Sequence, residues 1–261
     1  MRDITDRVAV VTGASSGIGR ATALALARAG AHLVLAARRE DALQRLANEV
    51  RSLGREALVV PTDVTSLQGV QHLVAQTLEQ WQRLEILVTC AGIYYRSPVA
   101  DISPILLQQS LAVNFYGSVY PVLEALPHML ARGEGHIVMV VSMDGKKGLP
   151  PDGPYVAAKF ALAGFGEVLR QELHATGVGV TLVFPGRVDT PMIADLEVPW
   201  ISAKVQPEIV ARAILRAIRR RQAEVIVPFQ ARLLLLVNFL SPRLGDWAVR
   251  AFRLEGRQVQ R

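Results

Sequence analysis

A tyrosine and a lysine stand four residues apart in a stretch that the sequence predicts to be helical. Pro154 suits the first position of a helix because its ring fixes φ near the helical value. Tyr155 and Lys159 then share one face of that helix. A nearby ammonium favours the ionised phenol and can bring its pKa well below the usual value of about 10. The spacing predicts an acid–base tyrosine tuned by a lysine; the alternative is an ordinary amphipathic helix.

A glycine-rich turn follows the first apolar run of the chain. Val8–Thr12 leads into Gly13-Ala14-Ser15-Ser16-Gly17-Ile18-Gly19 and then into a helical pattern. Such a turn lets backbone N–H groups approach phosphates, and the start of the helix adds partial positive charge. This placement favours a dinucleotide site over a flexible loop. The expected phosphate-binding residues are Gly13, Ser15, Ser16, Gly17, Ile18 and Gly19.

The group that contacts the adenosine ribose is expected about twenty residues further on, at the end of the second strand. The chain has Ala36-Ala37-Arg38-Arg39 there, with two arginines and no acid. An acid would bind a free 2′-hydroxyl, whereas guanidinium groups bind phosphate in a bidentate way. Arg38 and Arg39 therefore favour NADP(H) over NAD(H). The alternative is that both arginines lie on a solvated loop.

Strand and helix patterns alternate through most of the chain and must position these groups. Seven apolar runs predict strands buried on both faces: Val8–Thr12, His32–Ala36, Ala57–Val60, Ile86–Thr89, Ile137–Val141, Val180–Phe184 and Val225–Val227. Six longer patterns predict helices: Ile18–Ala29, Asp41–Leu53, Leu67–Trp81, Leu106–Leu130, Tyr155–Ala175 and Pro207–Arg221. The alternation predicts an α/β fold, a doubly wound (Rossmann) seven-stranded parallel sheet with helices on both faces. Residues 1–228 are expected to form this domain, and residues 229–261 a C-terminal helical extension of it.

The composition limits the class of protein. A chain of 261 residues with 51% hydrophobic and 20% charged residues suits one large globular domain. The net charge of +6 suits anionic partners, but no recognition motif accompanies it, so nucleic acid is not expected. Cys90 is the single cysteine, so no internal disulfide can form and a cytoplasmic location is expected. The histidines show no metal-ligand spacing, so no metal site is expected.

Targeting segments are not expected either. The first seven residues carry acids and no long apolar run, which disfavours a secretory signal. The longest aliphatic run, Leu233–Val237, is far shorter than the roughly 18 residues that span a bilayer.

The glycine turn, the Tyr-x-x-x-Lys pair and the length resemble the single-domain branch of the short-chain dehydrogenases/reductases. The resemblance runs from about Arg7 to Val227, and Ser142 stands thirteen residues before Tyr155, as is usual in that family. It implies a catalytic set of Asn114, Ser142, Tyr155 and Lys159, and a homodimer or homotetramer. It also implies cofactor contacts from Asp63, Val64, Ala91, Gly92, Tyr155, Lys159, Pro185, Gly186, Val188 and Thr190.

The resemblance implies hydride transfer between a nicotinamide and a carbonyl or secondary alcohol. Tyr155 would exchange a proton with the substrate oxygen, and Ser142 would hydrogen-bond that oxygen as it becomes charged. Lys159 would also bind the nicotinamide ribose, and Asn114 would hold a water of a proton relay. The alternatives are that Ser142 caps a turn and that Asn114 is a satisfied polar group. A nucleotide-sensing binding module without turnover is a second function, which the intact set disfavours.

One residue departs from the family pattern. The family usually has Asn-Ala-Gly where this chain has Cys90-Ala91-Gly92. The missing asparagine bears on the stability of the central sheet more than on the chemistry. Cys90 is expected to be a small buried hydrophobe rather than a reactive thiol.

The substrate is expected to be a hydrophobic small molecule. The residues expected to flank its pocket are Met143, Asp144, Leu149 and Pro150 on one side, and Arg187, Val188, Met192 and Ile193 on the other. A short lid is expected over about 191–205.

The apolar side chains of Phe229–Leu254 cannot all face water, so they must cover something. Cover of the pocket is expected first. Contact with an anionic membrane is second, because Arg250, Arg253 and Arg257 form a stripe there. In that case the protein would be a membrane-peripheral lipid ketone reductase. Arg212, Arg216 and Arg219 are expected on a solvated helix side.

Overall fold

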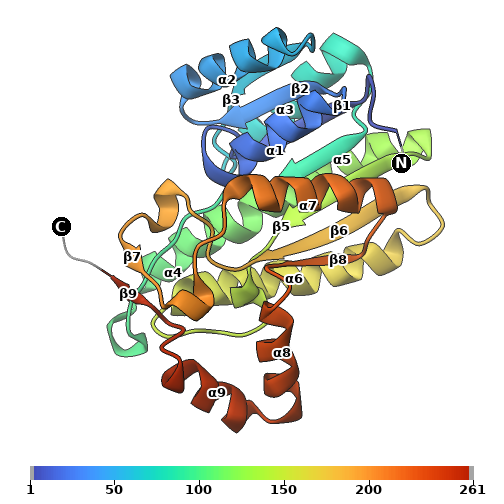
Figure 1. Ribbon diagram of the computed structural model, residues 1–261. Helices are drawn as coiled ribbons and strands as arrows, with labels where there is room; N and C mark the ends of the chain where they lie inside the picture. Colours follow the sequence, from blue (N-terminus) through green and yellow to red (C-terminus); the bar gives the residue numbers. More distant parts are fainter. Residues whose placement is uncertain (1–2, 259–261) are drawn as a thin grey trace.

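The centre of the molecule is a parallel sheet of seven strands. The computed structural model describes residues 3–258; Met1, Arg2 and the last three residues of the predicted extension lie outside the described residues. The strands are β1 (Val8–Thr12), β2 (His32–Ala37), β3 (Ala57–Pro61), β4 (Ile86–Thr89), β5 (Gly135–Val140), β6 (Val178–Pro185) and β8 (Glu224–Val227). Their order is β3-β2-β1-β4-β5-β6-β8, and every pair is parallel (Figure 1). The predicted fold class and its seven strands are confirmed.

The order of the strands reverses direction between β1 and β4. From β1 the chain proceeds outward to β2 and β3, and from β4 outward to β5, β6 and β8. In sheets of this kind ligands bind beyond the carboxyl ends of the strands at this reversal. The glycine turn after Thr12 and Cys90-Ala91-Gly92 after Thr89 both lie at this edge.

Helices cover both faces of the sheet, as predicted. One core contains residues of α1 (Gly17–Arg28), α2 (Glu40–Ser52) and α7 (Pro207–Arg220). The other contains residues of α3 (Leu67–Trp81), α5 (Gly117–Arg132) and α6 (Gly153–Glu172). Successive residues of a strand point to opposite faces. Accordingly, Ala9 and Val11 of β1 pack in the first core, and Val8 and Val10 in the second.

The helix predicted over Leu106–Leu130 is interrupted. α4 (Pro104–Leu111) and α5 are joined by a π-helical turn, Ala112–Tyr116, which contains Asn114. A π turn inserts one extra residue, changes the direction of the side chains within it, and is frequent at functional sites. Helical periodicity alone does not reveal such a turn, so the uninterrupted helix was a wrong prediction.

The C-terminal extension is largely helical, as predicted. α8 (Ala231–Leu240) and α9 (Pro242–Ala251) form a hairpin that projects from the sheet layers (Figure 1). Ser241 caps α9 by accepting a hydrogen bond from Leu244 N. The chain then returns to form β9 (Arg257–Gln258), which pairs antiparallel with β7 (Leu196–Glu197) in the predicted lid. Patterns did not predict these two-residue strands, because only the tertiary fold brings them together.

The helix α7 has one buried side and one exposed side. α7 buries Val210, Ile214 and Ile218 and exposes Arg212, Arg216 and Arg219, so the predicted solvated side is confirmed. Among residues 3–258, none of the helices has both the length and the apolar character that a bilayer crossing requires.

Candidate active site

The glycine turn has the geometry of a phosphate cradle. Gly13 and Gly17 adopt φ values of +66° and +53°, which residues with a side chain rarely adopt. A Cβ on Gly13 would lie 2.7 Å from Ala91 N, and one on Gly19 would clash with the carbonyl oxygen of Gly13. The turn ends at the N-terminus of α1, which favours anions. The residues present therefore fit a dinucleotide pyrophosphate.

Arg38 and Arg39 lie beside this turn. Arg39 Nη2 donates a hydrogen bond to Ser15 Oγ at 3.1 Å, which brings its guanidinium to the glycine turn. Arg38 is exposed and adds to the forces that lower the pKa of Asp63, the largest of which is the hydrogen bond from Thr65 N. Both arginines are thus available to a phosphate at the end of β2. Neither is buried in a structural ion pair.

Thr12 connects the glycine turn to the end of β4. Its Oγ1 accepts hydrogen bonds from Cys90 N at 3.2 Å and Ala91 N at 3.4 Å. Cys90 packs against the first core, and burial raises the pKa of its thiol to about 12. Such a thiol carries almost no thiolate at neutral pH. The structure therefore favours the predicted role of a small hydrophobe.

Asn114 joins three segments near the start of α6. Its Oδ1 accepts a hydrogen bond from Ile93 N at 3.1 Å, and its Nδ2 donates to Ile93 O at 3.0 Å and to Ser110 Oγ at 3.2 Å. Ser110 Oγ in turn donates to Pro154 O at 2.8 Å, one residue before Tyr155. Asn114 thus positions the loop after β4 against the start of α6, and its role in a proton relay stays a prediction. Spacing did not reveal the contribution of Ser110.

Ser142, Tyr155 and Lys159 lie together at the carboxyl edge of the sheet. All three are buried, and Lys159 Nζ lies 5.5 Å from the centre of the Tyr155 ring. Lys159 Nζ also donates a hydrogen bond to Val140 O at 3.1 Å at the end of β5. Ser142 caps the 3₁₀ turn Met143–Gly145, because its Oγ accepts a hydrogen bond from Asp144 N. The serine therefore has the capping role as well as a place beside Tyr155.

The predicted lowering of the Tyr155 pKa is wrong for this arrangement. Burial raises the pKa of the phenol, and the nearby carboxylate of Asp144 raises it further. Burial also lowers the pKa of Lys159 to about 8, so the lysine itself loses part of its charge near neutral pH. At 5.5 Å from the ring centre, Lys159 does not offset the desolvation of the phenol.

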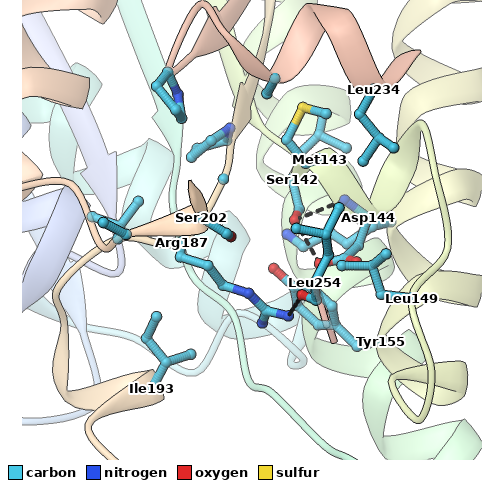
Figure 2. A pocket seen from close by; sticks show the side chains of 18 of the residues that line it. Ser142, Met143, Asp144, Leu149, Tyr155, Arg187, Ile193, Ser202, Leu234 and Leu254 are labelled. Carbon is cyan, nitrogen blue, oxygen red and sulfur yellow. Dashed lines mark hydrogen bonds between the residues drawn. The ribbon is translucent and has the colours of Figure 1, made fainter. Parts of the chain in front are cut away.

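These three residues line a cavity of about 390 Å³. Seven of the eight predicted flanking residues line it: Met143, Asp144, Leu149, Arg187, Val188, Met192 and Ile193. Figure 2 shows Met143 and Leu149 across the cavity from Ile193. Pro150 does not, because it stands at the exposed corner of the turn that Asp152 N closes on Leu149 O. Of the predicted cofactor residues, the same cavity is lined by Ile18, Gly92, Tyr155, Lys159, Pro185, Gly186, Val188 and Thr190.

The C-terminal extension covers this cavity. Leu233, Leu234 and Val237 of α8, Ala248 of α9 and the residues Phe252 and Leu254 after it all line the cavity. The first-ranked expectation for these residues, cover of the pocket, agrees with this lining. An apolar lining of this kind suits a hydrophobic ligand.

A buried ionic cluster attaches the C-terminal end to the site. Asp152 is fully buried; it accepts hydrogen bonds from Tyr94 Oη at 2.7 Å and Arg96 Nε at 3.0 Å. Arg187 Nη1 donates to Tyr94 Oη at 2.9 Å, and its Nη2 lies 3.8 Å from Asp152 Oδ2. The two arginines also donate to the carbonyl oxygens of residues 254–256. Asp152, next to the first residue of α6, thereby connects the tail to the start of that helix.

Sequence reasoning missed most of this cluster. Arg187 was expected at the pocket, but Tyr94, Arg96 and Asp152 were not singled out. Arg96 and Asp152 are 56 residues apart in sequence, so no local pattern relates them. Tyr94 and Arg96 follow β4, and Asp152 stands directly before α6, so their spacing gave no signal either.

Comparison with known proteins supports this architecture. The family model described as short chain dehydrogenase matches residues 7–198. Over 256 residues the chain is 34% identical to the uncharacterized oxidoreductase YxnA of Bacillus subtilis, covering 94% of this chain and 72% of that protein. It is 38% identical over 226 residues to the glycine betaine reductase ATRR of Emericella nidulans, covering 83% of this chain but 18% of that much longer protein.

Two solved structures with bound nucleotides are also similar. A short chain dehydrogenase/reductase from Burkholderia phymatum in complex with NAD has a TM-score of 0.86 and 28% identity, covering 94% of this chain and 96% of that one. An alcohol dehydrogenase from Thermococcus sibiricus complexed with 5-hydroxy-NADP has a TM-score of 0.78 and 28% identity, with 85% and 95% covered. The chain belongs to the short-chain dehydrogenase/reductase family. It is therefore an oxidoreductase of the nicotinamide-dependent kind.

The buried cluster predicts a large effect of Asp152→Ala on stability. The substitution leaves Arg96 and Arg187 buried without their carboxylate, which costs about 3–5 kcal/mol of unfolding free energy. Urea denaturation measures this loss, and proteolysis of residues 254–258 should become faster because the tail loses its attachment. The matched control is Asp41→Ala, which removes an exposed pair with Arg45 and should leave stability unchanged. Equal losses in the two variants would contradict the argument.

Proposed function

We propose that the protein is an NADP(H)-dependent carbonyl reductase or alcohol dehydrogenase that acts on a hydrophobic small molecule. In this proposal residues 1–228 form the nucleotide-binding and catalytic domain, and residues 229–261 close its substrate side. The observation that carries the proposal is that one cavity brings together three groups of residues. It is lined by predicted cofactor residues such as Gly92 and Thr190, by Ser142, Tyr155 and Lys159, and by the apolar extension.

The proposed chemistry follows from where the side chains lie. A bound nicotinamide would supply or accept the hydride. During reduction, negative charge grows on the carbonyl oxygen, and Tyr155 would donate the proton that neutralises it. Ser142 would donate a hydrogen bond to the same oxygen while the charge develops. In oxidation Tyr155 would accept the proton instead.

Lys159 would serve this reaction in two ways. One N–H of its ammonium group already donates to Val140 O, so two N–H groups remain. These could donate to a ribose hydroxyl and to a group on the substrate side of the cavity. With a pKa lowered by burial to about 8, Lys159 can also exchange a proton near neutral pH. A chain from Tyr155 through Lys159 to a water at Asn114 would return protons to solvent, as the family resemblance implies.

Preference for NADP(H) is part of the proposal. Arg39 reaches the glycine turn through Ser15, Arg38 is exposed beside it, and the end of β2 has no acid. A 2′-phosphate would find two guanidinium groups there, which pair well with phosphate. The Thermococcus alcohol dehydrogenase was solved with an NADP derivative, but the Burkholderia protein was solved with NAD. The arginines, rather than the neighbours, support the preference.

Contact with a membrane surface is a second proposal for the extension. Phe239 and Leu240 at the end of α8 are 85% and 72% exposed, and Phe229, Leu244 and Trp247 are also exposed. Patches of this kind commonly mark interaction sites. Residues 229–258 carry five arginines and only two acidic residues, so an anionic lipid surface matches their charge. A substrate dissolved in the membrane could then reach the cavity that α8 lines.

The other finer expectations stay proposals. Leu123 of α5 and Phe160 and Val168 of α6 are exposed, which supports a homodimer through these helices; sedimentation of the wild-type chain tests it. A cytoplasmic location is supported by the lone cysteine, and cell fractionation tests it. The alternative of a nucleotide sensor without turnover is disfavoured, because the catalytic side chains line a ligand-sized cavity.

Tyr155→Phe tests the proposed acid. The substitution keeps the ring and removes the proton donor, so kcat should fall by about 10²–10⁴-fold. NADPH oxidation with a panel of aliphatic, steroid-like and acyl ketones measures kcat, and fluorescence titration should show unchanged NADPH binding. Tyr116→Phe, an exposed tyrosine, is the control. Retention of more than about a tenth of the wild-type kcat would remove Tyr155 from the mechanism.

Arg38→Asp tests the preference for NADP(H). A carboxylate repels the 2′-phosphate and accepts a hydrogen bond from a free 2′-hydroxyl. Loss of a charge-assisted contact should lower kcat/KM for NADPH by about 10–100-fold and favour NADH. Arg45→Asp makes the same charge change on exposed α2 and should leave the ratio of the two cofactors unaltered. The idea fails if the wild type already prefers NADH.

Phe239→Asp with Leu240→Asp tests membrane contact without touching the cavity. Neither side chain lines the cavity, so turnover of soluble ketones should be unchanged. Sedimentation with anionic vesicles should show strong binding of the wild type and loss of it in this variant. Val99→Asp replaces an equally exposed apolar residue far along the chain and should retain binding. Failure of the wild type to bind anionic vesicles would exclude the membrane proposal.

A further inference from the structure

Asp144 is a buried carboxyl that the proposed reaction does not use. The residue is 7% exposed, lines the cavity and lies beside Ser142 (Figure 2). Ser142 Oγ donates a hydrogen bond to Asp144 Oδ2 at 3.1 Å, and Asp144 N donates to Ser142 Oγ at 3.1 Å. The hydroxyl proton of the serine is therefore directed at the carboxylate.

This direction matters because a serine hydroxyl has only one proton to donate. While the serine hydroxyl donates this proton to Asp144, it cannot donate it to the substrate oxygen. If the carboxyl is protonated, it can donate to Ser142 Oγ instead, and the two lone pairs of that oxygen accept the bonds from Asp144. The serine proton is then free for the substrate. The direction of the serine hydrogen bond thus depends on whether Asp144 carries a proton.

The surroundings of Asp144 favour protonation. Its Oδ1 is shielded from solvent and has no hydrogen-bond partner among residues 3–258. An ionised oxygen in such a place loses its hydration without replacement, which disfavours the charged form. Burial accordingly raises the pKa of Asp144 to about 6.

Charged and titratable groups face Asp144 from two other segments. Arg187, in the loop after β6, favours the ionised carboxylate, whereas Asp152, just before α6, opposes it. On α6, Lys159 favours the ionised form, and Tyr155 has its own pKa raised first by burial and then by Asp144. Ionised Asp144 therefore opposes negative charge at the same place where the reaction creates it.

We propose that Asp144 is a positioning residue that acts through Ser142: when protonated it frees the serine hydroxyl to donate to the substrate oxygen, and when ionised it retains that hydroxyl. The inference rests on the proposed carbonyl reduction. Tyr155 supplies the proton that is transferred, so Asp144 and Ser142 contribute hydrogen bonds only and their own proton count is unchanged over a turnover.

The expected signature is a pH step in kcat for reduction. Loss of one donor to a developing oxyanion lowers kcat by about 10²–10³-fold, so wild-type kcat should fall at least about tenfold as pH rises through the Asp144 pKa of about 6. KM should stay constant, because the contact strengthens only in the transition state. NADPH oxidation with the most active ketone of the panel measures both constants across this range.

Asp144→Asn separates positioning from a merely structural role. The amide donates to Ser142 Oγ at every pH, so the step should disappear and kcat at high pH should rise to the low-pH wild-type level. In a Ser142→Ala background the same substitution should bring no gain, because the residue through which it acts is missing. If the Asp144→Asn variant does not fold, Asp144→Ala takes its place. It also removes the carboxylate that accepts the serine proton, so the pH step should be absent.

Three kinetic results would overturn the inference. They are a wild-type profile without a step, a step that persists in Asp144→Asn, and a gain that survives in the Ser142→Ala background.

An infrared measurement needs no substrate and distinguishes failure of this inference from failure of the proposed function. The difference between wild type and Asp144→Asn isolates one carboxyl from the other acidic residues. It should show a protonated-carboxyl band that disappears as pH rises through about 6 and shifts in Ser142→Ala. A band that does not titrate, or does not respond to Ser142→Ala, overturns the inference. A titrating band without turnover of any ketone would overturn the proposed function, and with it the role in reduction.

Discussion

Parallel pairing of all seven strands is the constraint on which the rest of this structure depends. In a parallel sheet every strand must be followed by a crossover that returns the chain to the starting edge, so all carboxyl ends meet at one edge. The segments after β1, β4, β5 and β6 therefore supply the glycine turn, Gly92, Ser142 and Arg187 to the same place. α6, which packs on the sheet, adds Tyr155 and Lys159. Residues more than a hundred positions apart become neighbours for this reason alone.

Burial then determines the electrostatics of that edge. Tyr155, Lys159 and Asp144 all lie in a low-dielectric environment. Burial raises the pKa of the phenol and of the carboxyl and lowers that of the ammonium, so it favours the neutral form of each group. Lys159 and Asp144 are brought to about 8 and about 6, on either side of neutrality. Asp152 lies nearby and is paired with two arginines and a tyrosine hydroxyl. Two groups with pKa values on either side of neutrality thus lie beside a buried ion-pair cluster.

The C-terminal extension has two apolar sides. The inner side of α8 forms part of the wall of the cavity. Its outer side leaves Phe239 and Leu240 in solvent. The tail after α9 is attached by hydrogen bonds from Arg96 and Arg187 and by the pairing of β9 with β7. Arg187 contributes to both, because it lines the cavity and donates to the tail.

The sequence by itself determined the elements and the chemistry that local patterns encode. Apolar runs buried on both faces, the glycines of the turn and the interval from Ser142 to Tyr155 are local or fixed in spacing, and they predicted the sheet and the residues around the cavity. Tertiary structure alone decided the π turn at Asn114, the pairing of β7 with β9, the attachment of Asp152 to Arg96 and the pKa of Tyr155. Each of these depends on desolvation or on contacts between residues distant in sequence. Desolvation and long-range contacts produce no periodic pattern in the sequence, because they arise only after the helices have packed on the sheet.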